Sequence, residues 1–417
     1  MAEADHRRDP RRDHRHRPLS GRNPEESHRT ATPLELLYDL TFVVAFGTAA
    51  NELAHYLAEG HLGTAITGFC FAVFAVAWAW MNYSWFASAY DNDDWVFRVA
   101  TMVQMVGVIV NALGIAEMFA SIDRGASPDI DVMVLGYVVM RVSMLFLWAL
   151  VARHDPGRLP AARKFMWTIG VAQVGWVTVA LVDLPFAAFL AASAVLFAVE
   201  LVGPVLAQRR SPTPWHAHHI AERHGLLVLI TLGEGVLGTV AALNALVHTE
   251  HGWTADVALL AVAGIGLTFG IWWMYFVVPW GEVLERHRER AYVWSAGHIL
   301  LFGSIAATGA GLHVAAYFLE HVATLDTTAT VLTVAVPMSF FVLMLYVLYS
   351  IFMRHRDPFH LLLLAGTAGV VVLAVVCAEL GMSMSWCLVV LMLAPAVTVV
   401  GYETIGHRHV AEALARD

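Results

Sequence analysis

Uninterrupted apolar runs of about 20 residues recur along the whole chain, and they constrain its fold more than any other feature. A helix of about 20 apolar residues spans the roughly 30 Å hydrocarbon core of a bilayer. Of the 417 residues, 58% are hydrophobic and only 14% are charged, about half the charged fraction of an ordinary soluble surface. The sequence therefore predicts an all-α integral membrane protein whose main partner is the lipid bilayer.

Twelve runs are long enough to span a membrane. We expect helices over residues 34–57, 62–89, 95–120, 131–152, 164–183, 185–206, 219–247, 254–280, 292–319, 328–353, 359–379 and 383–405. The shortest turn is "VDLP" at 182–185, where a single kinked helix is the alternative, although it would exceed the bilayer thickness.

The Lys and Arg residues of the loops provide a test of the predicted number of helices. With the N-terminus inside, the loops on the inner side carry almost all the loop Lys and Arg, whereas the outer loops hold only Arg124. Such a bias marks the cytosolic face. We predict a multi-pass protein of the cell (cytoplasmic) membrane with both termini in the cytosol.

Weak similarities between the two halves of the chain predict its organisation. The segment 190–203 aligns without gaps on 393–406 and places Glu200 opposite Glu403. Six helices per half would make two parallel repeats. The predicted regions are a disordered Arg-rich cytosolic tail (1–33), two six-helix halves (34–210 and 211–406) and a cytosolic tail (407–417). The first tail mixes eight Arg with six acidic residues, which favours a topology anchor over nucleic-acid binding.

Charged residues inside the apolar runs are the candidates for function, because each one is costly there. Glu35 and Asp39 lie one helical turn apart near the inner end of the first helix, and Arg98 has a similar depth in the third. We predict a Glu35/Asp39–Arg98 cluster. It would either brace the two helices or handle ions or protons, and Glu35 could instead face the cytosol.

Two deeper charges extend this set of substrate- or ion-binding candidates. Arg141 lies near the middle of the fourth helix and should either pair with Glu117, Glu234 or Asp39, or hold an anion. Glu234 lies near the bilayer centre between Gly233 and Gly235. Because burial favours a protonated carboxyl, Glu234 is either a hydrogen-bonded core residue or a coordinating, proton-carrying one.

Glu222 completes the candidates and lies in a histidine-rich segment, "WHAHHIAERH". Histidine and carboxylate are ordinary zinc ligands, but a second ligand motif such as H-E-x-x-H is missing. We therefore expect no metal site here, and no cofactor elsewhere.

Three motifs together resemble the bacterial low temperature requirement A (LtrA) family: "ELLYDLTFVVAF", "YDNDDWVFRVATMVQM" and "HIAERHGLLVLITLGEGV". Matched by position, the resemblance marks Glu35, Asp39, Asp91, Asp93, Asp94, Arg98, His219, Glu222, Arg223, Gly233 and Glu234. The family usually carries aromatic residues where this chain has Leu37 and Tyr38, which is a conservative change at one position. The family name implies growth in the cold, and the resemblance implies no particular reaction.

Three classes of function stay open. The first is a secondary transporter or exchanger of an unknown small solute or ion, with proton coupling as one form. The second is a cation channel built from two six-helix repeats, acting as a homodimer; a fainter similarity to potassium channels rests only on Asp39 and Phe42. The third is a non-transport membrane protein of cold or stress adaptation. The glycines at 264, 266 and 270 break the nucleotide-binding pattern inside a predicted span, so we expect no ATP-driven pumping. We also expect that the protein is not an enzyme.

Overall fold

The computed structural model describes residues 17–26, 29–209, 211–247, 254–353 and 358–408. Within these ranges the protein is all-α and has no β-strand. Twelve of the described helical segments are long and apolar enough to cross a membrane, which confirms the predicted multi-pass fold and its count of spans.

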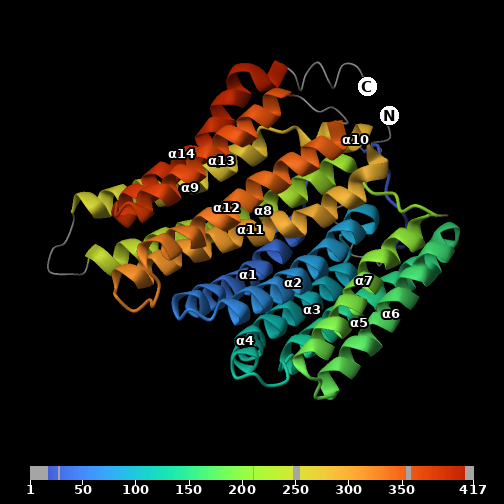
Figure 1. Cartoon of the computed structure of the whole chain (residues 1–417). Coiled ribbons are helices and arrows are strands. Elements are labelled where there is room, and N and C mark those ends of the chain that lie inside the picture. Colours follow the sequence, from blue (N-terminus) through green and yellow to red (C-terminus); the bar gives the residue numbers. More distant parts are fainter. Residues whose placement is uncertain (1–16, 27–28, 210, 248–253, 354–357, 409–417) are drawn as a thin grey trace, which may run out of the picture.

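The first six spans are formed by seven helices that lie along one another (Figure 1). They are α1 (Pro33–Ala58), α2 (Leu62–Tyr90), α3 (Trp95–Leu113), α4 (Ile115–Asp123), α5 (Asp131–His154), α6 (Leu159–Leu181) and α7 (Phe186–Gln208). The third span breaks at Gly114, and the chain passes so close to α5 there that a Cβ would lie 2.6 Å from the backbone nitrogen of Met133. The predicted turn at "VDLP" is confirmed, since α6 ends at Leu181 and α7 begins at Phe186.

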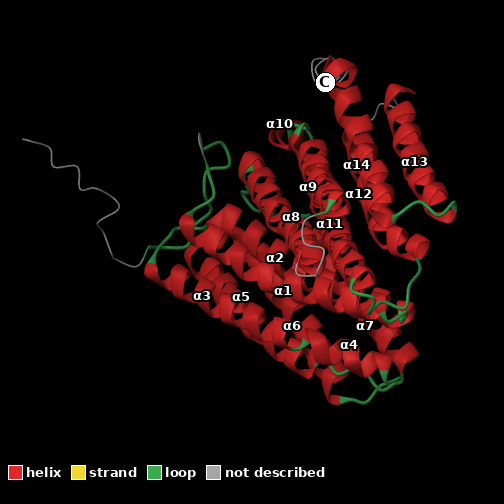
Figure 2. Cartoon of the chain, turned by 90° about the vertical axis from the view of Figure 1, so that its left-hand side faces the viewer, coloured by secondary structure: helices red, strands yellow, loops and turns green. Residues whose placement is uncertain are grey.

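The last six spans are formed by α8 (Ala217–Val247), α9 (Ala255–Phe276) with α10 (Trp280–Arg286), α11 (Ala291–Leu319), α12 (Thr327–Met353), α13 (Pro358–Glu379) and α14 (Met384–Gly401). Figure 1 shows α8, α11 and α12 between the blue and green helices of the first six spans and the group α9, α13 and α14. In Figure 2, α13 and α14 lie at the edge of the bundle.

The core of the bundle is centred on α11. Within its most apolar stretch 83% of the residues are buried, against 22% for α6, α7 and α13. α11 packs against α8 and α12 as well as against α1 and α2. The contacts of α1 with α8 and α11 therefore join the first six spans to the last six, and the candidate site lies along these contacts.

The two ends of the bundle differ in charge. One end, here called the basic end, carries the segment before α1 and the turns at 91–94, 155–158, 211–216 and 287–290. Its described residues include Arg22, Arg158, Arg209 and Arg288, whereas the turns of the opposite end contribute Arg124. The predicted alternation of cations along the chain is thus reproduced in space.

The segment before α1 packs on the basic end. Leu19 is fully buried, and its backbone N–H donates to His154 Nδ1 at 3.1 Å. Arg22 donates to the carbonyl of Asp91 at 2.9 Å. The prediction of a disordered tail over 1–33 is therefore wrong for residues 17–26 and 29–32, because an apolar side chain and backbone donors find partners on the bundle. Residues 1–16, and 409–417 of the predicted C-terminal tail, lie outside the described residues.

Candidate functional site

Glu35 and Asp39 of α1 meet Arg223 of α8 near the basic end, and all three side chains are buried. Arg223 Nη1 lies 2.9 Å from Glu35 Oε1. Its Nη2 donates to Asp39 Oδ1 at 2.5 Å, and its Nε donates to Asp39 Oδ2 at 3.1 Å. Three N–H groups of one guanidinium thus bind two carboxylates, which is the strong, charge-assisted form of the hydrogen bond.

The predicted partner of these two acids was Arg98, and that prediction is wrong. Arg98 instead forms an ion pair of 2.7 Å with Asp93, and its side chain is 52% exposed. Asp94 caps the N-terminus of α3 and accepts from Phe97 N. Arg98 lies on the outer side of that first turn, next to the loop carboxylate, and so it does not enter the bundle.

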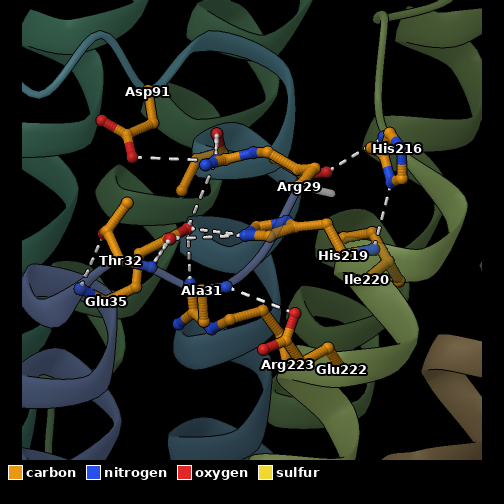
Figure 3. A network of polar contacts seen from close by, with 12 residues as sticks. Arg29, Ala31, Thr32, Glu35, Asp91, His216, His219, Ile220, Glu222 and Arg223 are labelled. Carbon is orange, nitrogen blue, oxygen red and sulfur yellow. Dashed lines mark hydrogen bonds and ion pairs between the residues drawn. The ribbon is translucent and has the colours of Figure 1, made fainter. Parts of the chain in front are cut away.

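Local sequence explains why the three charges converge. Thr32 and Glu35 form a capping box, in which Thr32 N donates to Glu35 Oε2 at 2.8 Å and Glu35 N donates to Thr32 Oγ1 at 3.3 Å. Pro33 occupies the first turn, where a missing N–H costs nothing. Glu35 and Asp39 are four residues apart, as are His219 and Arg223, so each pair shares one helix face. Figure 3 shows these faces opposed, with His219 Nε2 3.1 Å from Glu35 Oε1.

Further polar residues surround the pair of faces. The Trp80 indole N–H donates to Asp39 Oδ1 at 2.6 Å. Arg29 lies 3.8 Å from Glu35 and 3.7 Å from Asp91. Figure 3 shows Arg29 reaching from the segment before α1 toward both acids. The set formed by Arg29, Glu35, Asp39, Trp80, Asp91, His219 and Arg223 is called the Arg223 cluster below.

Two carboxyls lie at the edge of the Arg223 cluster. Burial, together with the negative charge of Glu35, raises the pKa of Asp91 to about 6. Glu222 is one residue before Arg223 but points elsewhere: its Oε2 accepts from the backbone N–H of Ala31 at 3.3 Å. Of the predicted candidates, the cluster thus contains Glu35 and Asp39, and it has Glu222 at its margin.

Arg141 belongs to a second buried ion pair, with a partner that the sequence did not predict. It lies 3.1 Å from Glu200 of α7, and both side chains are buried. Glu200 also accepts from Trp78 Nε1 at 2.5 Å and from the Tyr137 hydroxyl at 2.7 Å. Arg141 itself donates to Tyr137 Oη.

The predicted partners of Arg141, namely Glu117, Glu234 and Asp39, are therefore wrong. Glu117 pairs with Arg124 on the exposed surface of the opposite end, at 2.7 Å. The sequence did not reveal Glu200 as the partner, because depth along a helix does not show which helices are neighbours in the bundle. The ion pair joins α5 to α7.

Glu234 is buried in α8, between glycines of two other helices. A Cβ on Gly47 of α1 would lie 3.1 Å from Glu234 Oε1, and a Cβ on Gly309 of α11 would lie 2.6 Å from the Glu234 carbonyl carbon. No side chain or backbone group in the described ranges gives its carboxyl a hydrogen bond or an ion pair. Other helices approach α8 closely at Gly235 and Gly238, which pack against Thr268 and the backbone of Gly309, but not at Gly233, whose Cβ position is open.

Sequence reasoning therefore missed Arg223 and His219 as partners of Glu35 and Asp39. The signal that could have found them is the spacing of four residues between them at the start of a predicted helix. The other histidines of that segment take separate partners: His216 contacts Glu26 O, His218 contacts Glu285 and His224 contacts Ser295. The histidine-rich stretch thus does not gather around one point.

Comparison with known proteins gives the family context of these residues. The family model described as "Bacterial low temperature requirement A protein (LtrA)" matches residues 30–395. The uncharacterized protein RA0937 of Rhizobium meliloti (strain 1021) is 24% identical over 294 residues, which cover 66% of this chain and 67% of the relative. No solved structure matches. The matched range contains Glu35, Asp39, Arg141, Glu200, Arg223 and Glu234.

Proposed function

This chain belongs to the bacterial low temperature requirement A (LtrA) family, and from that premise we propose that it is a secondary transporter or exchanger. Its substrate would be a small solute or ion, and Glu234 would be the carboxyl that carries a proton. The observation that supports this most is the isolation of Glu234: it is buried on a membrane-spanning helix and has no polar partner among the described residues. Ionisable residues in such places usually mark a transport pathway.

The contrast with the other buried charges supports the same role. Arg223 and Arg141 are held by carboxylates at hydrogen-bond distance, so their charges are neutralised within the protein. Among the described residues, nothing compensates the ionised form of Glu234, which is therefore costly in the membrane. A proton or cation arriving from outside the protein would neutralise that form, and this property suits coupled transport.

The helix contacts around Glu234 also suit a moving part. α8 meets α1 at Gly47 and α11 at Gly309, with no side chain from these glycines interlocking the helices. Small residues at membrane helix contacts allow close backbone approach. A shift of α8 along these surfaces would expose the carboxyl first to one side of the membrane and then to the other.

The second candidate is a cation channel built from two repeats, and one observation favours it. In the first six spans, Trp78 of the second span donates to Glu200 of the sixth at 2.5 Å. In the last six, Trp273 of the eighth span donates to Glu403 of the twelfth at 3.0 Å. Glu200 and Glu403 are the residues that the sequence alignment of the halves pairs, and the shared contact supports parallel repeats.

Reconstitution into liposomes separates the candidates. The wild type, loaded with a pH-sensitive dye, is challenged with a panel of ion and solute gradients. Proton movement that requires a cosubstrate supports exchange, and passive cation flux without saturation supports the channel. Absence of any flux would favour a non-transport role in cold or stress adaptation.

Glu234→Gln tests the residue itself, because glutamine keeps the shape of the protonated carboxyl. We expect a stable protein whose flux is lost or no longer depends on pH. Glu117→Gln, an exposed acid at the opposite end, is the matched control and should transport normally. Normal pH-dependent flux in Glu234→Gln would reduce Glu234 to a packing residue.

The orientation in the cell membrane is part of the proposal. The excess of cations at one end supports a cytosolic location for both termini under the positive-inside rule. Reporter fusions after Lys164 and Arg290 should be cytosolic, and a fusion after Arg124 should be outside. A fusion after Arg290 that reads outside would contradict this orientation.

A further inference from the structure

The basic end holds a large cavity that neither the Arg223 cluster nor Glu234 uses. Its volume is about 930 Å³, which is within the size range of small-molecule sites. Its walls come from five segments: residues 21–24 before α1, Trp85 of α2, the turn between α5 and α6, the end of α7 with the chain that leads to α8, and residues 288–292 at the start of α11. The cavity therefore lies where the first six spans meet the last six.

Arginine is the main charged residue in the lining of this cavity. Four arginines line it, Arg22, Arg158, Arg209 and Arg288, against only two acidic residues, Asp155 and Glu289. The acidic residues are partly occupied elsewhere: Asp155 Oδ2 accepts from Gly21 N at 3.2 Å, and Glu289 lies 3.4 Å from Arg290. Arg22 is itself paired with Glu26 at 2.7 Å, so Arg158, Arg209 and Arg288 carry the excess positive charge of the described lining.

Protein contacts position these arginines but do not exhaust their donors. Arg288 Nη2 donates to the Trp215 carbonyl at 2.6 Å, and its guanidinium lies 4.1 Å from the centre of the Trp215 ring. Arg158 Nη1 donates to the carbonyl of Pro212. Arg209 has no partner among the described residues. Since each guanidinium has five N–H donors in a planar fork, most of the donors at Arg158, Arg209 and Arg288 stay available to a ligand.

The inner wall is aromatic. Trp85 and Trp215 meet edge to face, with ring centres 4.9 Å apart, and Tyr292 lies beside them in the lining. These residues give the cavity an apolar floor below its cationic rim. Trp85 and Tyr292 also line a smaller cavity of about 30 Å³ that reaches Trp78, the donor to Glu200.

We propose that this cavity binds an anion that carries phosphate groups. Several guanidiniums around one space suit a multivalent anion, because arginine binds phosphate through paired N–H groups. The ligand could be a soluble phosphate compound of the cytosol or the headgroup of an anionic lipid, since basic pockets between membrane helices bind such headgroups. This site is independent of the proton-carrying role of Glu234.

The test uses the full-length protein with two probes. Inorganic pyrophosphate is titrated by calorimetry into the protein in detergent. Retention of phosphatidylglycerol or cardiolipin is measured by native mass spectrometry after purification from nanodiscs that contain these lipids. The variant is Arg158→Gln with Arg209→Gln, which removes two cations that make few contacts within the protein. Arg209→Gln alone serves if the double variant is unstable.

Arg98→Gln is the matched control, because Arg98 lies at the same end of the bundle and is exposed, but is outside the cavity. We expect the wild type to bind at least one probe, the double variant to bind it at least about tenfold more weakly, and the control to stay within about twofold. Loss of two charge-assisted contacts sets this scale.

The two probes separate the sources of the ligand. Binding of pyrophosphate that the double variant loses assigns the site to a soluble phosphate compound. Retention of lipid alone, lost in the double variant, assigns it to a lipid headgroup. The proposal is overturned if the wild type binds neither probe, or if the variant that melts like the wild type binds both equally well. Neither outcome depends on whether protons are transported.

Discussion

Arg223 and Glu234 lie eleven residues apart on α8, about 16 Å along the helix, and both are buried. Their surroundings are opposite. Arg223 is bound by Glu35 and Asp39, whereas Glu234 faces Gly47 and Gly309. The comparison teaches that a buried charge in a membrane protein is not by itself a functional site. A charge whose partners are already in place is suited to bracing helices, and one without a partner is suited to binding something mobile.

The largest effect on stability is expected when Arg223, the buried charge that has partners, is removed. Arg223→Gln would leave two buried carboxylates without their cation and should cost about 3–5 kcal/mol of unfolding free energy. Arg98→Gln, which removes an exposed arginine from the same end, should change it by less than about 0.5 kcal/mol. Thermal unfolding of the purified variants in detergent measures both. An Arg223→Gln protein that melts like the wild type would show that the Arg223 cluster is not a brace.

A double-mutant cycle sharpens the assignment of partners. Asp39→Asn combined with Arg223→Gln should be non-additive by about 1–3 kcal/mol, because the two residues share two hydrogen bonds. Asp39→Asn combined with Arg98→Gln should be additive within about 0.5 kcal/mol. The reverse pattern in the melting data would restore the Arg98 pairing that the sequence suggested.

The sequence predicted the membrane spans and the need for a cation near Glu35 and Asp39, but not which cation it is. Apolar run length and cation bias were enough for the twelve spans, and the spacing of Glu35 and Asp39 was enough to demand a nearby cation. The identity of that cation was not accessible, because it depends on α1 packing against α8, a helix about 180 residues away. Hydropathy sets the depth of a residue in the membrane but not which helices are neighbours.

The same limit explains Arg141 and the segment before α1. Glu200 was named only as the residue that aligns with Glu403, because the sequence does not show that α7 comes within ion-pair distance of α5. Leu19 lies in a polar stretch, and its burial depends on a pocket formed by distant turns. The functional role of Glu234 stays a prediction: the sequence marked it by its depth, whereas the glycines that it faces, Gly47 and Gly309, belong to α1 and α11.

A smaller effect on stability is expected from substitutions of the glycines around Glu234. Gly309→Ala would place a methyl group 2.6 Å from the backbone of Glu234 and should cost about 1–3 kcal/mol through overpacking. Gly233→Ala is the matched control: nothing lies within 4 Å of its Cβ position, so better helix propensity should stabilise the protein by about 0.5–1 kcal/mol. Equal melting temperatures for the two variants would contradict the close contact between α8 and α11.

The smallest effect on stability is expected at Asp91, and it tests whether this carboxyl at the edge of the Arg223 cluster is ionised. Asp91 accepts from Asp93 N at 2.7 Å and lies 3.7 Å from Arg29, and burial raises its pKa from 3.8 to about 6. The folded state therefore holds this proton more tightly than the unfolded state does. The resulting stabilisation is fully present below about pH 4 and is lost as the pH rises through about 6.

Asp91→Asn keeps the acceptor oxygen for the turn but cannot ionise. Between pH 5 and pH 7.5 the wild type should therefore lose about 1 kcal/mol of stability relative to Asp91→Asn, measured as the difference between their unfolding free energies at each pH. Asp93→Asn, in the same loop but about half exposed, controls for the loss of a loop carboxyl and should follow the wild type. A difference between wild type and Asp91→Asn that does not change with pH would mean that Arg29 holds Asp91 ionised throughout. Every carboxylate of the Arg223 cluster would then have a cationic partner. Glu234 would remain a buried acid without one among the described residues.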